Sequence, residues 1–169
     1  MGEIKLIPIG VVHTSFSDEE VKDSPYGVEG ILEVFEVFSA GLEGIEGFSH
    51  LIVVAFLDRV GDDQRRVLRV KFRRLLKFGL TIEDLPEVGV FCSDSPHRPN
   101  PLALTVVELT DRKGCLLYVR NLDLFDGTPI LDLKPYTPDR RVEKLKLPEW
   151  YRKLMDRVSL ASGLREPRL

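Results

Sequence analysis

The segment Ser95-Pro96-His97-Arg98-Pro99-Asn100-Pro101 stands between two stretches of strand-forming residues. Each of its three prolines removes a backbone donor, fixes φ and moves the preceding residue out of the α region. The segment therefore cannot be a helix interior or a central strand, and we predict a stiff, extended loop. Rigid loops on a β scaffold often carry binding and catalytic side chains, so its polar residues become candidate site residues.

Short apolar or alternating stretches around this loop predict strands separated by turn residues. The predicted strands cover residues 5–13, 30–38, 51–57, 88–92, 104–109, 115–119 and 130–133, with a hairpin turn over 111–114. Residues 149–161 have the apolar spacing of a helix, whereas the basic stretch 65–80 fits either a strand pair or a helix. The pattern indicates a mainly β fold, a small closed barrel with peripheral helices.

The composition fits a single domain with a small appendage, because 43% of the 169 residues are apolar and 30% are charged. We predict a barrel domain over 1–138 and a basic helical extension over 139–169. No stretch is long and apolar enough for a membrane span, and the first residues lack a secretory pattern. Cys92 and Cys115 lack metal-ligand spacing, which predicts no metal site and two small core thiols in a reduced cytoplasmic setting.

The net charge of −3 argues against a nucleic-acid partner, but the positive charges are unevenly distributed. One basic tract lies between residues 59 and 78, and a second follows residue 140. Such tracts are either solvated faces or surfaces that guide a polyanion. The candidate RNA-binding residues are Arg65, Arg66, Arg69, Arg73, Arg74, Arg140 and Arg141.

Common catalytic motifs are missing from the sequence: there is no GxSxG, no GxGxxG and no phosphate-binding GxxxxGK[ST]. Polar residues gather instead at predicted strand ends, including Asp126-Gly127-Thr128-Pro129, which reads equally well as a turn or a site. Arg98 offers fork-shaped donors for a carboxylate or phosphate, and Asn100 can pair with a base edge or a backbone group.

Four segments in order resemble the TsaA-like, or TrmO-type, methyltransferase family over roughly residues 7–138. They are PIGVVH at 8–13, GIEGFSH at 44–50, GVF at 89–91 with the proline loop, and DGTP at 126–129 with DLKPY at 132–136. The resemblance implies a β-barrel that binds S-adenosylmethionine, usually as a homodimer. It also implies methylation of N6 of threonylcarbamoyladenosine next to the anticodon of tRNA.

The same resemblance places cofactor contacts on five parts of this sequence. The implied contacts are Pro25, Tyr26, Gly27, Asp58, Arg59, Asp94, Arg98, Leu104, Asp126, Gly127, Thr128 and Pro129. Candidates for receiving the proton that leaves during methyl transfer are Asp126, His97 and a carboxylate of the substrate, and Asn100 is a further catalytic candidate.

The sequence departs from the family pattern at three of these positions. Asp94 stands where the family usually has arginine, Tyr26-Gly27 where it has Arg-Gln, and Asp58 where a histidine commonly precedes Arg59. Because these changes alter charge beside the cofactor, two other functions stay open. One is a cofactor-binding enzyme that acts on a different substrate, and the other is a non-catalytic RNA-binding or regulatory barrel.

Overall fold

The computed structural model describes residues 3–163. These residues form two compact units. The barrel unit combines the residues up to 59 with 101–140, and the second unit combines 60–100 with the residues from 141 onward. This grouping packs residues 60–100 with the C-terminal helix. The division into a barrel domain over 1–138 and a basic helical extension over 139–169 stays a prediction.

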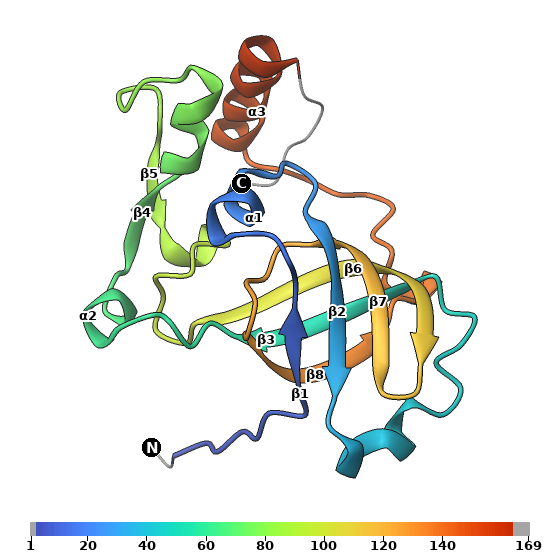
Figure 1. Cartoon of the computed structure of the whole chain (residues 1–169). Helices are drawn as coiled ribbons and strands as arrows, with labels where there is room; N and C mark the ends of the chain where they lie inside the picture. Colours follow the sequence, from blue (N-terminus) through green and yellow to red (C-terminus); the bar gives the residue numbers. More distant parts are fainter. Residues whose placement is uncertain (1–2, 164–169) are drawn as a thin grey trace. The chain divides into compact units, whose positions relative to one another are not determined.

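Six antiparallel strands close into a barrel in the order β1-β2-β7-β6-β3-β8 (Figure 1). Their bounds are β1 Gly10–His13, β2 Val28–Val34, β3 His50–Phe56, β6 Leu102–Lys113, β7 Leu116–Leu122 and β8 Pro129–Pro135. Pairing of β1 with both β2 and β8 closes the cylinder, which leaves no open sheet edge. The mainly β, closed-barrel prediction is therefore confirmed.

Side chains that alternate along the strands fill the barrel interior. Val12, Leu32, Val53, Val107 and Leu117 are each fully buried there. Period-two alternation puts every second residue inside, so the neighbours of these residues face outward and remain free for polar contacts. The rigid core thus fixes the loops at the strand ends.

The bounds of the predicted barrel strands differ most from the observed ones at three places. The first begins at Gly10 and not at residue 5. Toward the N-terminus, the hydrogen bonds between strands end at Ile9, and no strand pairs with the described residues before it. The second ends at Val34, and Glu36–Leu42 form the 3-10 helix η1. The predicted turn residues 111–113 instead lengthen β6, since a bulge after Leu109 carries the strand to Lys113.

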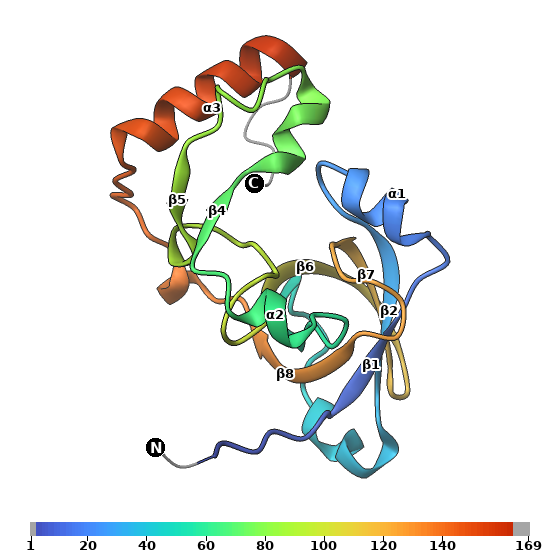
Figure 2. The same ribbon diagram turned by 90° about the vertical axis from the view of Figure 1, so that its left-hand side faces the viewer.

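The second unit contains a short antiparallel ribbon and several helices (Figure 2). Its elements are α2 Asp62–Arg65, β4 Arg69–Lys71, η2 Arg73–Phe78, β5 Glu87–Gly89, η3 Val90–Cys92 and α3 Glu149–Ser162. The basic stretch that fitted either a strand pair or a helix is therefore divided between α2, β4 and η2. The predicted strand 88–92 becomes β5 followed by the single 3-10 turn η3.

The helix α3 confirms the predicted helix to within one residue at its C-terminal end. Its apolar face buries Leu154 and Val158 beside Leu75, and Trp150 stacks on Phe72 with ring centroids 5.9 Å apart. Apolar residues spaced three and four apart form this face, which explains why the helix was predictable from its pattern.

An acidic residue ties α3 to the loop before β5. Hydrogen bonds from the backbone and hydroxyl of Thr81, with a smaller contribution from Arg157, hold the pKa of Asp84 below its usual value. A carboxyl with a lowered pKa stabilises the fold above its unfolded-state pKa, and this contribution disappears as the pH falls through the folded-state pKa. We expect Asp84→Asn to lower the melting temperature at pH 7 and to have less effect near pH 3, measured by thermal denaturation monitored by circular dichroism.

The cysteine prediction is wrong for both thiols. Cys92 is exposed, and Cys115 is partly exposed and donates to a carboxylate oxygen of Glu36 at 3.1 Å. The nearby carboxylate raises the pKa of the Cys115 thiol. Both thiols are free and neither is a core residue, because Cys92 is the last residue of η3 and Cys115 lies in the turn between β6 and β7.

Membrane-spanning helices and clusters of metal-ligating side chains are both absent from residues 3–163. None of the helices in this range has the length and apolar character needed to cross a membrane. The same range contains no group of three or more His, Cys, Asp or Glu side chains placed to hold a metal ion.

Candidate functional site

Arg59 is the centre of a polar cluster in the barrel unit. Its guanidinium donates to Asp18 Oδ2 at 2.6 Å through Nη1 and to the backbone oxygen of Asp126 at 2.7 Å through Nη2. The same guanidinium lies 5.4 Å from the ring centroid of Phe125, and Lys22 Nζ lies 5.1 Å from that ring. Three chain segments that are distant in sequence therefore meet at one cation.

The short helix α1, Asp18–Asp23, places the acidic partner of this arginine. Ser17 caps the helix and Glu20 accepts a hydrogen bond from the Ser17 backbone, which forms a capping box. These hydrogen bonds lower the pKa of Glu20. Because the cap fixes the first turn, the carboxylate of Asp18 is positioned before any ligand arrives.

Asp126 is held by the end of β1. Its Oδ1 accepts from the backbone nitrogen of Thr14 at 3.1 Å, and the backbone of Gly127 donates to the oxygen of Val12 at 2.9 Å. Thr128 is 3% exposed, whereas the side chain of Asp126 is 59% exposed. The DGTP segment is thus anchored by its backbone and by Thr128, and it presents one carboxylate to solvent.

A histidine lies between two carboxylates on the outer face of the barrel. His13 Nε2 is 2.6 Å from Glu33 Oε2, and His13 Nδ1 is 3.9 Å from Asp126 Oδ1. The next residue, Thr14, bonds both the DGTP segment and β2, since its Oγ1 also donates to the backbone oxygen of Glu29. The arrangement links Asp126 to a second carboxylate through an imidazole.

The loop of Pro25, Tyr26 and Gly27 follows α1 and precedes β2. Gly27 has a φ of +84°, and a Cβ there would lie 2.5 Å from the backbone carbon of Asn121. Ser24 Oγ donates to the Gly27 oxygen at 2.6 Å. This close approach to β7 requires glycine, which is a structural reason for Gly27 where the family usually has glutamine. Tyr26 remains 54% exposed.

Two further predicted contacts in the barrel unit are exposed. Asp58 follows β3 closely, and its backbone nitrogen bonds the oxygen of Phe56 at 2.9 Å. Leu104 lies on β6 opposite Val54 of β3 and is 72% exposed. The described contacts join Arg59 and Asp126 directly. Asp58, just after β3, and Leu104, on the neighbouring strand β6, have no described contact with that cluster.

These barrel-unit groups fit an S-adenosylmethionine-like cofactor by their chemistry. Such a molecule carries a positive sulfur, an amino-acid portion with both charges, and an adenine ring. The exposed carboxylate of Asp126 suits the positive groups, the guanidinium of Arg59 suits a carboxylate, and exposed Tyr26 and Leu104 offer apolar surface to a ring. Neither Arg59 nor Asp126 is a buried charge without a partner, since both side chains are about half exposed.

The proline loop lies in the second unit, and its arginine makes hydrogen bonds to the backbone of the same unit. Arg98 Nη2 donates to the backbone oxygens of Val90 at 3.0 Å and Ser93 at 2.5 Å. Arg98 Nε is buried and has no hydrogen-bond partner among the described residues. The half-buried guanidinium therefore holds the chain at η3, and as a cofactor contact Arg98 stays a prediction.

The other candidates of this loop are accessible. The amide nitrogen of Gln64 donates to His97 Nε2 at 3.1 Å, which occupies the nitrogen that would otherwise accept a proton. Asp94 and Asn100 are exposed. As catalytic candidates, His97 and Asn100 stay predictions, and Asp94 stays a predicted cofactor contact.

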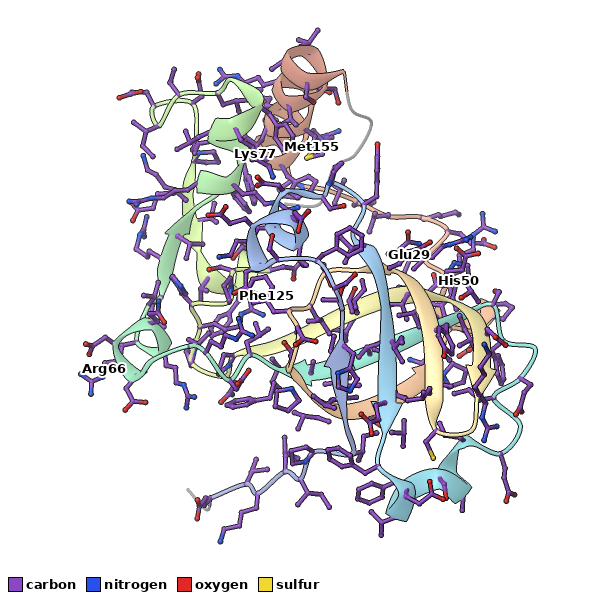
Figure 3. The ribbon with its side chains drawn as sticks, viewed as in Figure 1. Glu29, His50, Arg66, Lys77, Phe125 and Met155 are labelled. Atoms are coloured by element: carbon purple, nitrogen blue, oxygen red, sulfur yellow. The ribbon has the colours of Figure 1, made fainter. Side chains whose placement is uncertain are left out.

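The candidate RNA-binding arginines are distributed over both units. Arg66 at the end of α2 (Figure 3), Arg73, Arg140 and Arg141 are exposed, and Arg66 lies 3.7 Å from Asp63. Arg69 on β4 pairs with Glu87 at 3.4 Å. Arg65 donates to the backbone oxygen of Val60, and Arg74 is half-buried and engaged by other groups. Two of the seven, Arg65 and Arg74, are therefore half-buried, and the other five are exposed.

Sequence reasoning missed Asp18, Lys22 and Glu33 as members of the cluster. Asp18 is 41 residues from its arginine partner, and only the capping pattern before it gave a local signal. Glu33 and His13 face outward from neighbouring strands, and an alternating strand pattern could have suggested this pairing. Phe125, labelled in Figure 3, directly precedes the DGTP segment. In the sequence it is only one residue of a predicted polar turn, and nothing there indicates that its ring lies near Arg59.

Comparison with known proteins gives a consistent result. The family model for the tRNA-methyltransferase O N-terminal domain matches residues 11–140. A probable S-adenosyl-L-methionine-binding protein of Pyrococcus abyssi is 38% identical over 160 residues, which cover 91% of this chain and 79% of that protein. The family match includes residues of all six barrel strands and the residues of the second unit between them.

Two further similarities cover less of the related proteins. A tRNA (adenine(37)-N6)-methyltransferase of Mus musculus is 47% identical over 53 residues, which are 31% of this chain and 12% of that protein. The crystal structure of TrmO from Pseudomonas aeruginosa superposes with a TM-score of 0.63 at 25% identity and covers 88% of this chain. This chain spans 62% of the length of that solved chain.

Proposed function

Since the chain belongs to the tRNA-methyltransferase O N-terminal domain family, we propose that it is an S-adenosylmethionine-dependent tRNA methyltransferase. Its substrate is threonylcarbamoyladenosine next to the anticodon, and the methyl group goes to N6. The family model over residues 11–140 carries the proposal. The cluster of Arg59 and Asp126 supports it, because the matched region includes both residues and offers one cation beside one exposed carboxylate.

The cofactor supplies a methyl group activated by a positively charged sulfur. During transfer the N6–carbon bond forms, the carbon–sulfur bond breaks, and the proton on N6 must leave to an acceptor. The carboxylate of Asp126 is that acceptor, because its side chain is exposed and its Oδ1 is already fixed by Thr14. His97 is less suited, since its Nε2 accepts from Gln64.

The remaining residues of the barrel cluster position these groups. Arg59 spans Asp18 and the Asp126 backbone, so it holds the loop that carries the carboxylate. Its cation also attracts the carboxylate of the cofactor or of the threonyl group of the substrate. Most of the rate enhancement then comes from alignment of the nitrogen with the methyl–sulfur bond. Exposed arginines of the second unit, Arg66 and Arg73, bind phosphates of the tRNA.

Labelled methyl transfer with three acceptors tests the proposed activity. Purified protein is incubated with methyl-labelled cofactor and with tRNA that carries threonylcarbamoyladenosine, tRNA that lacks it, or a total protein extract. We expect label only in the first. Label in the second or third acceptor would assign a different substrate, and cofactor binding by calorimetry without any transfer would assign a non-catalytic barrel.

A homodimer and a cytoplasmic location are part of the same proposal and rest on the family resemblance. An apolar stretch near the N-terminus supports the homodimer, because Ile4, Leu6 and Ile7 are each at least 60% exposed. Surfaces of this kind are commonly covered by a partner. Light scattering after gel filtration of the full chain would give the mass of a dimer, and a monomeric mass at micromolar concentration would contradict the proposal.

A further inference from the structure

Phe91 is an aromatic side chain of the second unit that the folding of this unit does not use. It is 80% exposed, whereas its neighbour Val90 in the same 3-10 turn is 1% exposed. The side chain of Val90 is thus buried, and the side chain of Phe91 extends into solvent. An exposed phenylalanine contributes little to the folding free energy, so this ring is available to contact a ligand.

The turn that carries Phe91 is fixed on its inner side. The backbone nitrogen and the hydroxyl of Ser93 both donate to the oxygen of Val90, at 3.2 and 2.9 Å. Arg98 donates to the same oxygen and to the oxygen of Ser93. The serine hydroxyl in turn accepts from the backbone nitrogen of Ser95. The phenylalanine therefore stands on a backbone with few alternative conformations, and little entropy is lost when its ring meets a ligand.

Positively charged side chains belong to the same unit as this ring, and one of them stands on the strand that pairs with the residues before it. The backbone nitrogen of Val90 donates to the oxygen of Leu68 at 2.9 Å, and Arg69 pairs across the ribbon with Gly89, two residues before the ring. Arg69 also contacts Glu87 at 3.4 Å, an exposed pair that leaves its guanidinium accessible. Proteins that bind single-stranded nucleic acid combine these two elements, a cationic groove and an aromatic ring on which a base stacks.

We propose that Phe91 stacks on an unpaired base of the RNA substrate and that Arg98 is the positioning residue that holds its turn. This inference rests on the proposed tRNA substrate and names a contact for it. Phe91 takes a base because its ring is exposed, and Arg98 acts through the turn because its Nη2 donates to two backbone oxygens there.

Steady-state kinetics with tRNA as the varied substrate test the contact. We expect Phe91→Ala to raise the KM for tRNA by about 5- to 100-fold, the size of one lost base–aromatic stack, while kcat changes less than about threefold. Phe91→Trp should restore the KM, because any aromatic ring can stack. The control is Leu160→Ala, which removes an apolar side chain of similar exposure from α3 and should leave both constants unchanged.

A double-variant comparison tests the role of Arg98. Arg98→Ala should raise the KM for tRNA as Phe91→Ala does, and the double variant should be no worse than Phe91→Ala alone, since both changes remove one contact. Additive losses would overturn the positioning role. Melting temperatures of all variants identify any general loss of folding.

Three results would overturn the stacking contact. They are an unchanged KM for tRNA in Phe91→Ala, a matching loss of S-adenosylmethionine affinity in calorimetry, and a change from dimer to monomer in light scattering. If the unchanged protein transfers no methyl group, the proposed function fails by itself. Fluorescence anisotropy with a labelled single-stranded oligoribonucleotide then still tests Phe91, because it needs no turnover.

Discussion

Replacement of Asp126 by alanine is expected to reduce methyl transfer to tRNA by about 100-fold or more, the usual loss when a proton acceptor is removed. The carboxylate is exposed, and its Oδ1 is held by the backbone of Thr14. Alanine removes both the acceptor and this hydrogen bond. Asparagine keeps an oxygen for Thr14 but cannot take a proton, so Asp126→Asn separates the two roles. We expect Asp126→Asn to remain nearly as slow as alanine in single-turnover measurements of the transfer rate.

The matched control for this prediction is another exposed aspartate of the barrel unit. Asp111 on β6 accepts from the backbone of Arg112 at 2.8 Å and lies 3.8 Å from Lys113, so it makes a similar local bond and a weak ion pair. Asp111→Ala should keep full activity. Activity of Asp126→Asn within a few-fold of the unchanged protein would show that Asp126 positions its loop and accepts no proton.

Replacement of Gly10 by alanine is expected to have the largest effect on stability. A Cβ at Gly10 would lie 2.2 Å from the backbone oxygen of Glu33 and 3.1 Å from the Cα of Val34, its partner in β2. Neither atom can move away, because both belong to the closed barrel. We expect a loss of about 3 kcal/mol, which corresponds to a melting temperature lower by about 6–12 °C for a chain of this size.

Gly41 provides the control for that substitution. It lies in η1 without a positive φ, and a Cβ added there would meet nothing within 4 Å. Gly41→Ala should therefore change the melting temperature by less than about 2 °C, given the small effect of most surface substitutions. Equal losses for Gly10→Ala and Gly41→Ala would contradict the close packing of β1 on β2.

The sequence predicted strands correctly where the apolar segment has a neighbouring strand to pair with. Residues 51–57 and 130–133 pair with each other in the barrel, and both were predicted from their apolar side chains. Residues 5–8 were predicted as part of the same strand, but none of the described strands pairs with them, so the strand begins at Gly10. Strand formation depends on distant residues, and a local pattern cannot report whether they are present.

The candidate site was predictable in its members but not in its connections. Arg59 and Asp126 follow from the family motifs, but the bond from Arg59 to Asp18 joins residues that have no sequence relation. Arg98 looked like a free ligand for an anion because a sequence does not show that a guanidinium is half-buried. Nor does a sequence show its two bonds to backbone oxygens, which join it to the turn at Val90 and Ser93.

The nucleoside composition of the reacted tRNA tests the proposed activity most directly. Purified full-length protein is incubated with S-adenosylmethionine and tRNA bearing threonylcarbamoyladenosine, and the digested nucleosides are analysed by fragmentation mass spectrometry. We expect one additional methyl group on the base portion of the threonylcarbamoyladenosine, at N6, and about 100-fold less of this product with Asp126→Ala at the same early reaction time. Unmethylated threonylcarbamoyladenosine after reaction with the unchanged protein, or a methyl group on any other nucleoside, would contradict the proposed activity.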